Sequence, residues 1–199
     1  MKNIISISFL LLLVNNAIGQ TDIYISGGVG IGNHCSKRDP IVTPFKLSAI
    51  PSYSIGLKAK LERFNKFKPV IGLNYLRTGS DYRNTFSTSP IYFRYHYLNL
   101  PIGLDMDICG GLGAGAFISV SIPFAHEGPR LQEPTRPGTD LGFSPSVYYR
   151  FKKCELNATY HFGLSDAARI GYLGDTDYRF FNRVFLMKFG YRIHSLSTK

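Results

Sequence analysis

The stretch YLNLPIGLDM, residues 97–106, decides the fold of this chain, because its side chains alternate in kind at every step. Two faces result, one with Leu98, Leu100, Ile102, Leu104 and Met106, the other with Tyr97, Asn99, Pro101, Gly103 and Asp105. A period of two residues is typical of a β-strand whose faces meet different surroundings. The stretch therefore predicts a strand with one apolar face and one small or polar face.

The same alternation recurs along most of the chain, and convincing 3.6-residue periods are hard to find. Seven further segments show it, at residues 23–31, 53–61, 71–75, 112–122, 141–151, 156–164 and 181–193. Only the last is blurred, because Val184 and Leu186 interrupt its polar face. Together with the quoted stretch, these segments make eight predicted strands.

The connections between these strands alternate between long and short. The long ones are about Gly32–Pro51, Thr78–Pro90, Pro123–Asp140 and Asp166–Tyr178, and the short ones Asn65–Lys68, Asp107–Gly110 and Lys152–Lys153. Long outer loops and tight periplasmic turns between an even number of strands are typical of outer-membrane barrels. We therefore predict an all-β fold, a single up-and-down antiparallel transmembrane β-barrel of eight strands with its amino terminus on the periplasmic side.

Alternation alone does not say which face points inward, and a soluble exported calyx-type ligand binder is the alternative. Two features favour the apolar face outward. Aromatic residues concentrate on that face, and the polar face is rich in glycine, which relieves crowding in the narrow interior of an eight-stranded barrel.

The first residues have the layout of a secretory signal. Lys2 precedes an apolar run, Ile4–Val14, and Ala17-Ile18-Gly19 offers small residues before a cleavage point. The apolar run is too short for a transmembrane helix. We expect residues 1–19 to be a cleaved signal peptide and residues 20–199 to be one barrel domain in the cell outer membrane.

The basic balance of the chain limits its partners. Lys and Arg number 23 against 13 Asp and Glu, and cleavage removes only Lys2, so the mature net charge is 22 − 13 = +9. An exported chain meets little nucleic acid, and we expect no nucleic-acid partner. The expected partners are outer-membrane lipid and, through the extracellular loops, an anionic glycan or an envelope protein.

Two short segments resemble the PorT-like outer-membrane β-barrel family. Residues 97–104 match its Tyr-Leu-x-x-Pro-hydrophobic stretch, and residues 160–166 match its aromatic-Gly-Leu-Ser/Thr-Asp run. Asn99 stands where that family more often has Glu. The resemblance implies an outer-membrane barrel, and most such proteins have no assigned activity.

The charged residues of the polar face are the first candidate site. They include Lys58, Lys60, Glu62, Asp105, Arg150, Glu155, Lys188 and Arg192. Most fall toward the periplasmic half, and both signs are present. Because buried charges must be paired, we interpret them as an ion-paired core that fills a closed lumen. A narrow ion path is the alternative interpretation.

Catalytic signals are weak. Ser165, His161 and Asp166 are neighbours in sequence, but their order matches no catalytic motif, and no Gly-x-Ser-x-Gly occurs. We expect no enzyme and no catalytic residues, with a barrel enzyme acting on envelope lipid as the alternative.

The three cysteines are the remaining candidates for special chemistry. Cys35, Cys109 and Cys154 lack the CxxC spacing of a zinc site, so we expect no metal and no cofactor. Cys109 and Cys154 begin strands two apart at one rim, about 9–10 Å from each other. A disulfide needs Cα atoms within about 7 Å, so its formation stays open.

The long connections are where recognition is expected, because loops on a rigid scaffold carry most binding function. The first contains Lys37, Arg38 and Lys46, and the third contains Arg130 and Arg136 among prolines. We therefore predict an integral outer-membrane barrel of structural or recognition type, with the extracellular loops as its binding surface.

Overall fold

The computed structural model describes residues 20–36, 45–62, 66–84, 91–128, 138–172 and 176–197. The expected signal peptide, residues 1–19, lies outside these ranges, as do Lys37, Arg38, Arg130 and Arg136. None of the described residues belongs to a helix that is long and apolar enough to cross a membrane.

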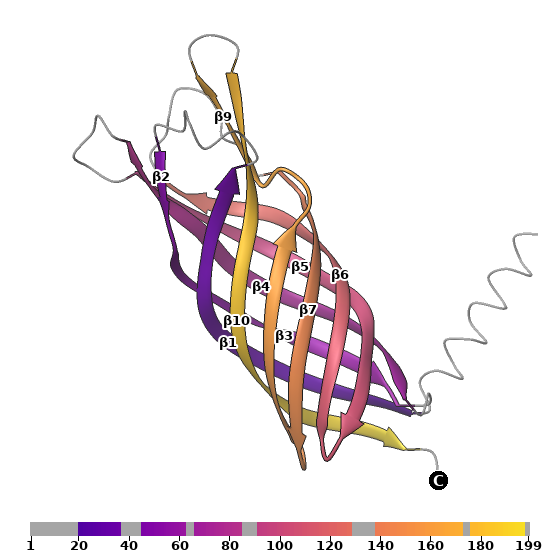
Figure 1. Cartoon of the computed structure of the whole chain (residues 1–199). Helices are drawn as coiled ribbons and strands as arrows, with labels where there is room; N and C mark the ends of the chain where they lie inside the picture. The colour runs from indigo at the N-terminus through magenta and orange to yellow at the C-terminus, as the bar shows by residue number, and fades with distance from the viewer. Residues whose placement is uncertain are drawn as a thin grey trace, which may run out of the picture.

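The described residues form one antiparallel sheet that closes on itself (Figure 1). Its strands are β1 (Gln20–Ser36), β2 (Phe45–Ser48), β3 (Ile50–Leu61), β4 (Phe67–Asn84), β5 (Ile91–Cys109), β6 (Leu112–Glu127), β7 (Asp140–Phe151), β8 (Cys154–Gly163), β9 (Ala168–Tyr172) and β10 (Thr176–Ser197). The ring runs β1-β3-β4-β5-β6-β7-β8-β10 in chain order, and β10 returns to β1. The predicted up-and-down barrel of eight strands is confirmed.

The ring is closed by a long pairing between its first and last strands. Every residue of β1, from Gln20 to Ser36, lies opposite β10, with one irregularity between Ile23 and Tyr24. Each of the eight described ring strands therefore has a neighbour on both sides. A β-structure inside lipid needs this arrangement because no water is there to satisfy its backbone.

Two short strands stand outside the ring, at the end that carries the long connections. β2 pairs with the outer part of β4, and β9 forms a hairpin with the start of β10 that projects beyond the barrel (Figure 1). We refer to this end as the outer end and to the end with the tight turns as the periplasmic end.

Several predicted loops are wrong, because the strands continue into them. β4 runs to Asn84 and β5 begins at Ile91, where a loop from Thr78 to Pro90 was expected. In these extensions Arg77 points outward, whereas Tyr82 and Phe93 are buried inside. The pattern is thus inverted relative to the membrane-spanning part. A strand prediction that expects apolar residues on the outward face therefore misses these extensions and assigns them to a loop.

The apolar face points outward over the middle of the barrel. The outward Ile118 is 67% exposed, whereas the inward Lys60 and Asp105 have no exposed surface. This arrangement is the reverse of an apolar calyx, so the soluble alternative is wrong. Aromatic rings such as Phe143 and Phe185 do point outward, but Tyr24, Tyr97 and other rings fill the interior, so aromatic residues distinguish the two faces only in part.

Glycine makes room for large interior side chains, as the sequence predicts. A Cβ at Gly142 would lie 2.0 Å from Cε1 of His161, and a Cβ at Gly113 would lie 2.2 Å from Cζ of Tyr148. The rings of Tyr148 and His161 therefore occupy the space that a side chain on the neighbouring strand would need.

We predict that Ile118→Arg lowers the free energy of unfolding by about 2–4 kcal/mol, because Ile118 lies in the middle of the outward apolar band. The matched variant is Ile108→Arg, at the periplasmic rim and 55% exposed, for which the cost falls to about 0–1 kcal/mol. Urea unfolding in lipid vesicles measures both. Equal and small effects of the two substitutions would contradict a lipid-facing surface at Ile118.

Candidate functional site

The periplasmic half of the lumen holds a layer of ion pairs. At its centre Lys60 contacts both Asp105 and Glu155, the latter at 3.2 Å. Glu155 also pairs with Lys58. All but Lys58 are almost completely buried. The layer therefore links β3, β5 and β8 across the interior.

A second group of charges lies nearer the periplasmic turns. Lys68 bridges Glu62 and Asp107, the latter at 2.6 Å. Arg150 lies between the two groups, 3.6 Å from Glu62 and from Asp107 and 3.9 Å from Glu155. The predicted ion-paired core is thus present, with Lys68 and Asp107 as members that the sequence pattern missed.

Arg192 is satisfied separately, because it donates to Asp22 at 2.8 Å across the closing β1–β10 pair. Lys188 does not form the ion pair that we expected for every charged residue of the polar face. Among the residues that the structure describes, no carboxylate lies within ion-pair distance of it. Its side chain instead lines a cavity of about 80 Å³ above the ion layer.

A chain of hydrogen bonds crosses the lumen above that cavity. Nδ1 of His161 lies 3.0 Å from the Ser144 hydroxyl, and Nε2 lies 3.0 Å from Oδ2 of Asp140. Asp140 also accepts from the amide of Asn182 at 2.9 Å, and Asn182 contacts His34 at 3.0 Å. The chain ties β7, β8, β10 and β1 together through buried groups.

The sequence-adjacent set of Ser165, His161 and Asp166 is not brought together. The Ser165 hydroxyl donates to the carbonyl of Thr139 and accepts from the amide of Leu141, and Asp166 lies 3.7 Å from Arg179. The hydrogen bonds of His161 to Ser144 and Asp140 are not predictable from sequence spacing, because the sequence pattern assigns Asp140 to the end of a long connection and not to a strand.

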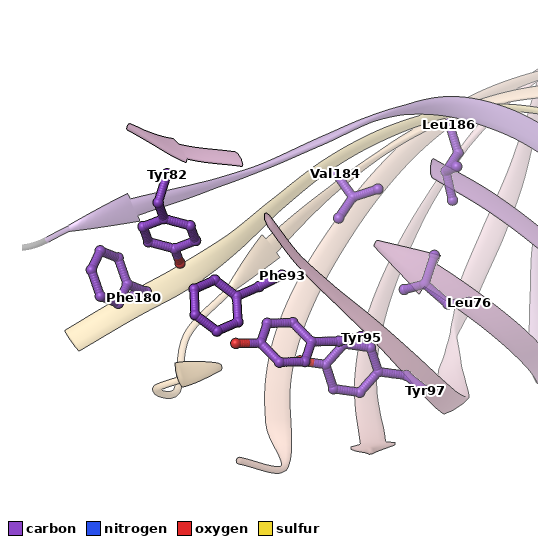
Figure 2. Close-up of a cluster of buried hydrophobic side chains, with 8 residues drawn as sticks. All are labelled: Leu76, Tyr82, Phe93, Tyr95, Tyr97, Phe180, Val184 and Leu186. Carbon is purple, nitrogen blue, oxygen red and sulfur yellow. The ribbon is translucent and has the colours of Figure 1, made fainter. Parts of the chain in front are cut away.

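The outer half of the lumen is closed by apolar and aromatic side chains, which we call the outer aromatic cluster (Figure 2). It consists of Leu76, Tyr82, Phe93, Tyr95, Tyr97, Phe180, Val184 and Leu186. The Tyr82 ring meets Phe93 and Phe180 edge-on, with centroids 4.9 and 5.2 Å away. Such edge-to-face contacts suit the charge distribution of aromatic rings.

His34 is a histidine embedded among the rings of this cluster. Tyr82 donates its hydroxyl to Nδ1 at 2.5 Å, Nε2 faces the Asn182 oxygen, and the Tyr95 ring stacks 5.6 Å away. These partners suit the neutral tautomer with its proton on Nε2. Burial lowers the pKa of His34 to about 4, although the Asn182 hydrogen bond favours the charged form.

On the outer surface, the extensions of β4, β5 and β6 carry charges above the apolar band. Arg94 pairs with Asp81 at 2.7 Å, and Arg77 pairs with Glu127 at 3.0 Å. Hydrogen bonds from Arg77 and His96 hold the pKa of Glu127 below its usual value. Charges facing outward at this level indicate that the strands have left the hydrocarbon.

Two cations of this outer surface face each other without an acid between them. Lys46 on β2 is directly opposite Arg83 on β4, and both are exposed. In the described parts of the chain, neither has an ion-pair partner. Like charges opposite each other destabilise a pair of strands. We call Lys46 and Arg83 the outer cationic surface.

The remaining sequence candidates take structural places. Cys35, Cys109 and Cys154 are free thiols, so the disulfide considered for the last two is absent. Asn99 donates to the Ser121 hydroxyl at 2.8 Å, inside the lumen. Among the described residues, no group of three His, Cys, Asp or Glu side chains could hold a metal ion.

We predict that the outer end of the barrel loses stability as the pH falls from about 6.5 towards about 4. The folded-state pKa of His34 lies below its unfolded value, so protons bind preferentially to the unfolded state in that window. His34→Gln should flatten this pH dependence, whereas His126→Gln on the exposed surface should leave it unchanged. Heat-denaturation midpoints at pH 7.5 and 4.5 provide the measurement, and an undiminished pH dependence in His34→Gln would contradict the assignment.

Comparison with known structures identifies the fold. OprG from Pseudomonas aeruginosa, an outer-membrane protein, superposes with a TM-score of 0.57 at 15% identity over 87% of this chain and 96% of its own. The outer-membrane protein AlkL superposes with a TM-score of 0.51 at 12% identity over 91% of this chain and 93% of its own. No family model and no curated protein matches the sequence. The chain has the fold of small outer-membrane β-barrels, and its outward apolar band makes it an integral outer-membrane protein.

Proposed function

We propose that this protein is an outer-membrane recognition protein whose extracellular strands bind an anionic glycan. The proposal rests on Lys46 and Arg83, which lie directly opposite each other on β2 and β4. Among the described residues, neither side chain has a carboxylate within ion-pair distance. A sulfate, phosphate or carboxylate group between them would replace a repulsion by two charge-assisted hydrogen bonds.

The position of this pair supports an external ligand. Lys46 and Arg83 belong to paired strands, so their spacing is held by the backbone ladder. Arg94 lies on the next strand, and its guanidinium lies 5.6 Å from the exposed ring of Tyr92. Arg94 is already paired with Asp81, so Lys46 and Arg83 would supply the free charges for an acidic sugar, and Tyr92 offers an aromatic face at the same end of the barrel.

The filled interior also favours binding at the outer surface over transport or catalysis inside the barrel. The outer aromatic cluster occupies the outer half of the lumen, and the ion layer occupies the periplasmic half. We therefore propose that the barrel is not a pore. Ser144, His161 and Asp140 are buried in this interior, away from lipid and solvent, so we also propose that the protein acts without catalysis.

The finer family placement is also a proposal. The stretches at residues 97–104 and 160–166 support a relation to the PorT-like barrels. Residues 97–104 lie in the middle of β5, and residues 160–163 form the outer end of β8, with residues 164–166 directly after it. Neither stretch includes Lys46 or Arg83.

We predict that the protein in zwitterionic nanodiscs binds dextran sulfate, does not bind neutral dextran, and binds less tightly as salt rises. The double substitution Lys46→Ala and Arg83→Ala should weaken binding about tenfold or more, because hydrogen bonds to charged groups contribute about 1.5–3 kcal/mol each. Biolayer interferometry measures the affinity.

The matched control is Lys66→Ala with Lys153→Ala. It removes two exposed positive charges at the periplasmic turns and so keeps the same net charge as the test variant. Equal weakening in both variants would indicate attraction by net charge alone and would contradict the outer cationic surface as the site.

We predict that the purified protein produces no stepwise currents in a planar bilayer at neutral pH, with a general porin as the positive control. The buried Lys60–Asp105 pair and the aromatic rings above it would both have to move for ions to pass. Reproducible unitary currents would contradict the closed lumen, provided that the sample is the folded barrel, as shown by a shift of its gel mobility on heating.

A further inference from the structure

We propose that the lumen contains a binding site for one small inorganic anion of the size and charge of chloride, held by Lys188 in the cavity between the ion layer and the outer aromatic cluster. This site is separate from the outer cationic surface and does not depend on it.

The size of the cavity restricts its occupant. Its volume is about 80 Å³, enough for a few water molecules or a small ion. Pockets for organic ligands measure roughly 300–1,000 Å³. The next inward residues above Asn74 and Asn99 are Leu76 and Tyr97 of the aromatic cluster, so the cavity does not extend into a channel.

The partners of the charges around the cavity favour an anion. Six cations face the periplasmic half and the cavity, namely Lys58, Lys60, Lys68, Arg150, Lys188 and Arg192, against the five carboxylates Asp22, Glu62, Asp105, Asp107 and Glu155. Every one of these carboxylates is already paired. A sixth buried carboxylate of the lumen, Asp140, lies above the cavity and bonds to His161 and Asn182. Lys188 is the cation that has no carboxylate within ion-pair distance in the described lumen. An unpaired charge removed from bulk water costs several kcal/mol, and a monovalent anion would offset that cost.

The placement of Lys188 is imposed by its neighbours. It lies opposite Gly28 on β1 and Asn157 on β8. A Cβ at Gly28 would come within 2.6 Å of its Cγ, so the aliphatic stem lies across that glycine. The glycine therefore provides the space through which the lysine reaches the cavity.

Neutral donors complete the site. Asn74, Asn99 and Asn157 line the cavity. The Thr159 hydroxyl bonds to the side-chain oxygen of Asn157, which orients that amide and leaves its nitrogen available as a donor. Lys58 and Glu155 also lie on the cavity wall, where they neutralise each other, so Lys188 supplies the unpaired positive charge. Ammonium and amide N–H groups are the donors by which a protein coordinates a spherical anion.

The test is crystallography of the full mature chain refolded in bromide, because bromide is a chloride analogue with an anomalous signal. We expect one anomalous peak in the lumen within hydrogen-bond distance of Nζ of Lys188. Lys188→Met should remove that peak, and Lys153→Met, at the exposed periplasmic turn, should retain it. A lumen that holds only water in the wild type, or a peak that survives in Lys188→Met, would overturn the proposal.

A solution measurement keeps the proposal falsifiable if Lys188→Met does not fold. At equal ionic strength, the wild type refolded in chloride should denature at a higher temperature than the wild type refolded in gluconate, an anion too large for the cavity, because a ligand bound only by the native state stabilises it. Lys188→Gln should remove that difference. Identical midpoints of the wild type in the two salts would overturn the site.

Discussion

The closure of β1 on β10 is the constraint on which the rest of the structure depends. Inside lipid, each backbone N–H and C=O must find a partner within the protein, and only a sheet without edges satisfies all of them. Here the pairing spans the whole of β1, from Gln20 to Ser36. Once eight strands are closed in this way, the lumen is too narrow for a water-filled channel and must be filled by side chains.

The filling divides into two chemical zones. The periplasmic half is filled by charges that neutralise one another, with Lys60 and Asp105 fully buried at the centre. The outer half is filled by rings that need no counter-charge, with His34 kept neutral among them. Glycines on the neighbouring strands, Gly113 beside Tyr148 and Gly142 beside His161, allow such large groups to fit. Both zones block the axis, which is why we place recognition on the outside.

The sequence predicted most of this barrel because the membrane enforces a strict rule on its middle. Where outward residues meet lipid, alternation is regular, and strands such as residues 97–106 are recognised at once. Above the lipid the rule no longer applies. Tyr82 and Phe93 turn inward while Arg77 and Asp81 turn outward, so the extensions resembled loops. The presence of ion pairs in the lumen was predictable, because the polar face of the strands carries both positive and negative side chains. The identity of each pair depends on strand stagger, which periodicity does not contain.

The two proposed anion sites follow from one physical principle applied at two depths. In the described lumen, Lys58, Lys60, Lys68, Arg150 and Arg192 each pair with a carboxylate, and Lys188 does not. Lys188 inside, and Lys46 with Arg83 outside, lie where the strand ladder and not a flexible loop fixes their position. Lys46 and Arg83 are exposed, so water solvates their charges and the absence of a counter-ion costs little free energy. A ligand there can bind and dissociate reversibly. The enclosed lysine has no such freedom, so its counter-ion must be taken up as the barrel closes. This difference predicts a salt-sensitive, reversible partner at the outer surface and a permanent one in the lumen.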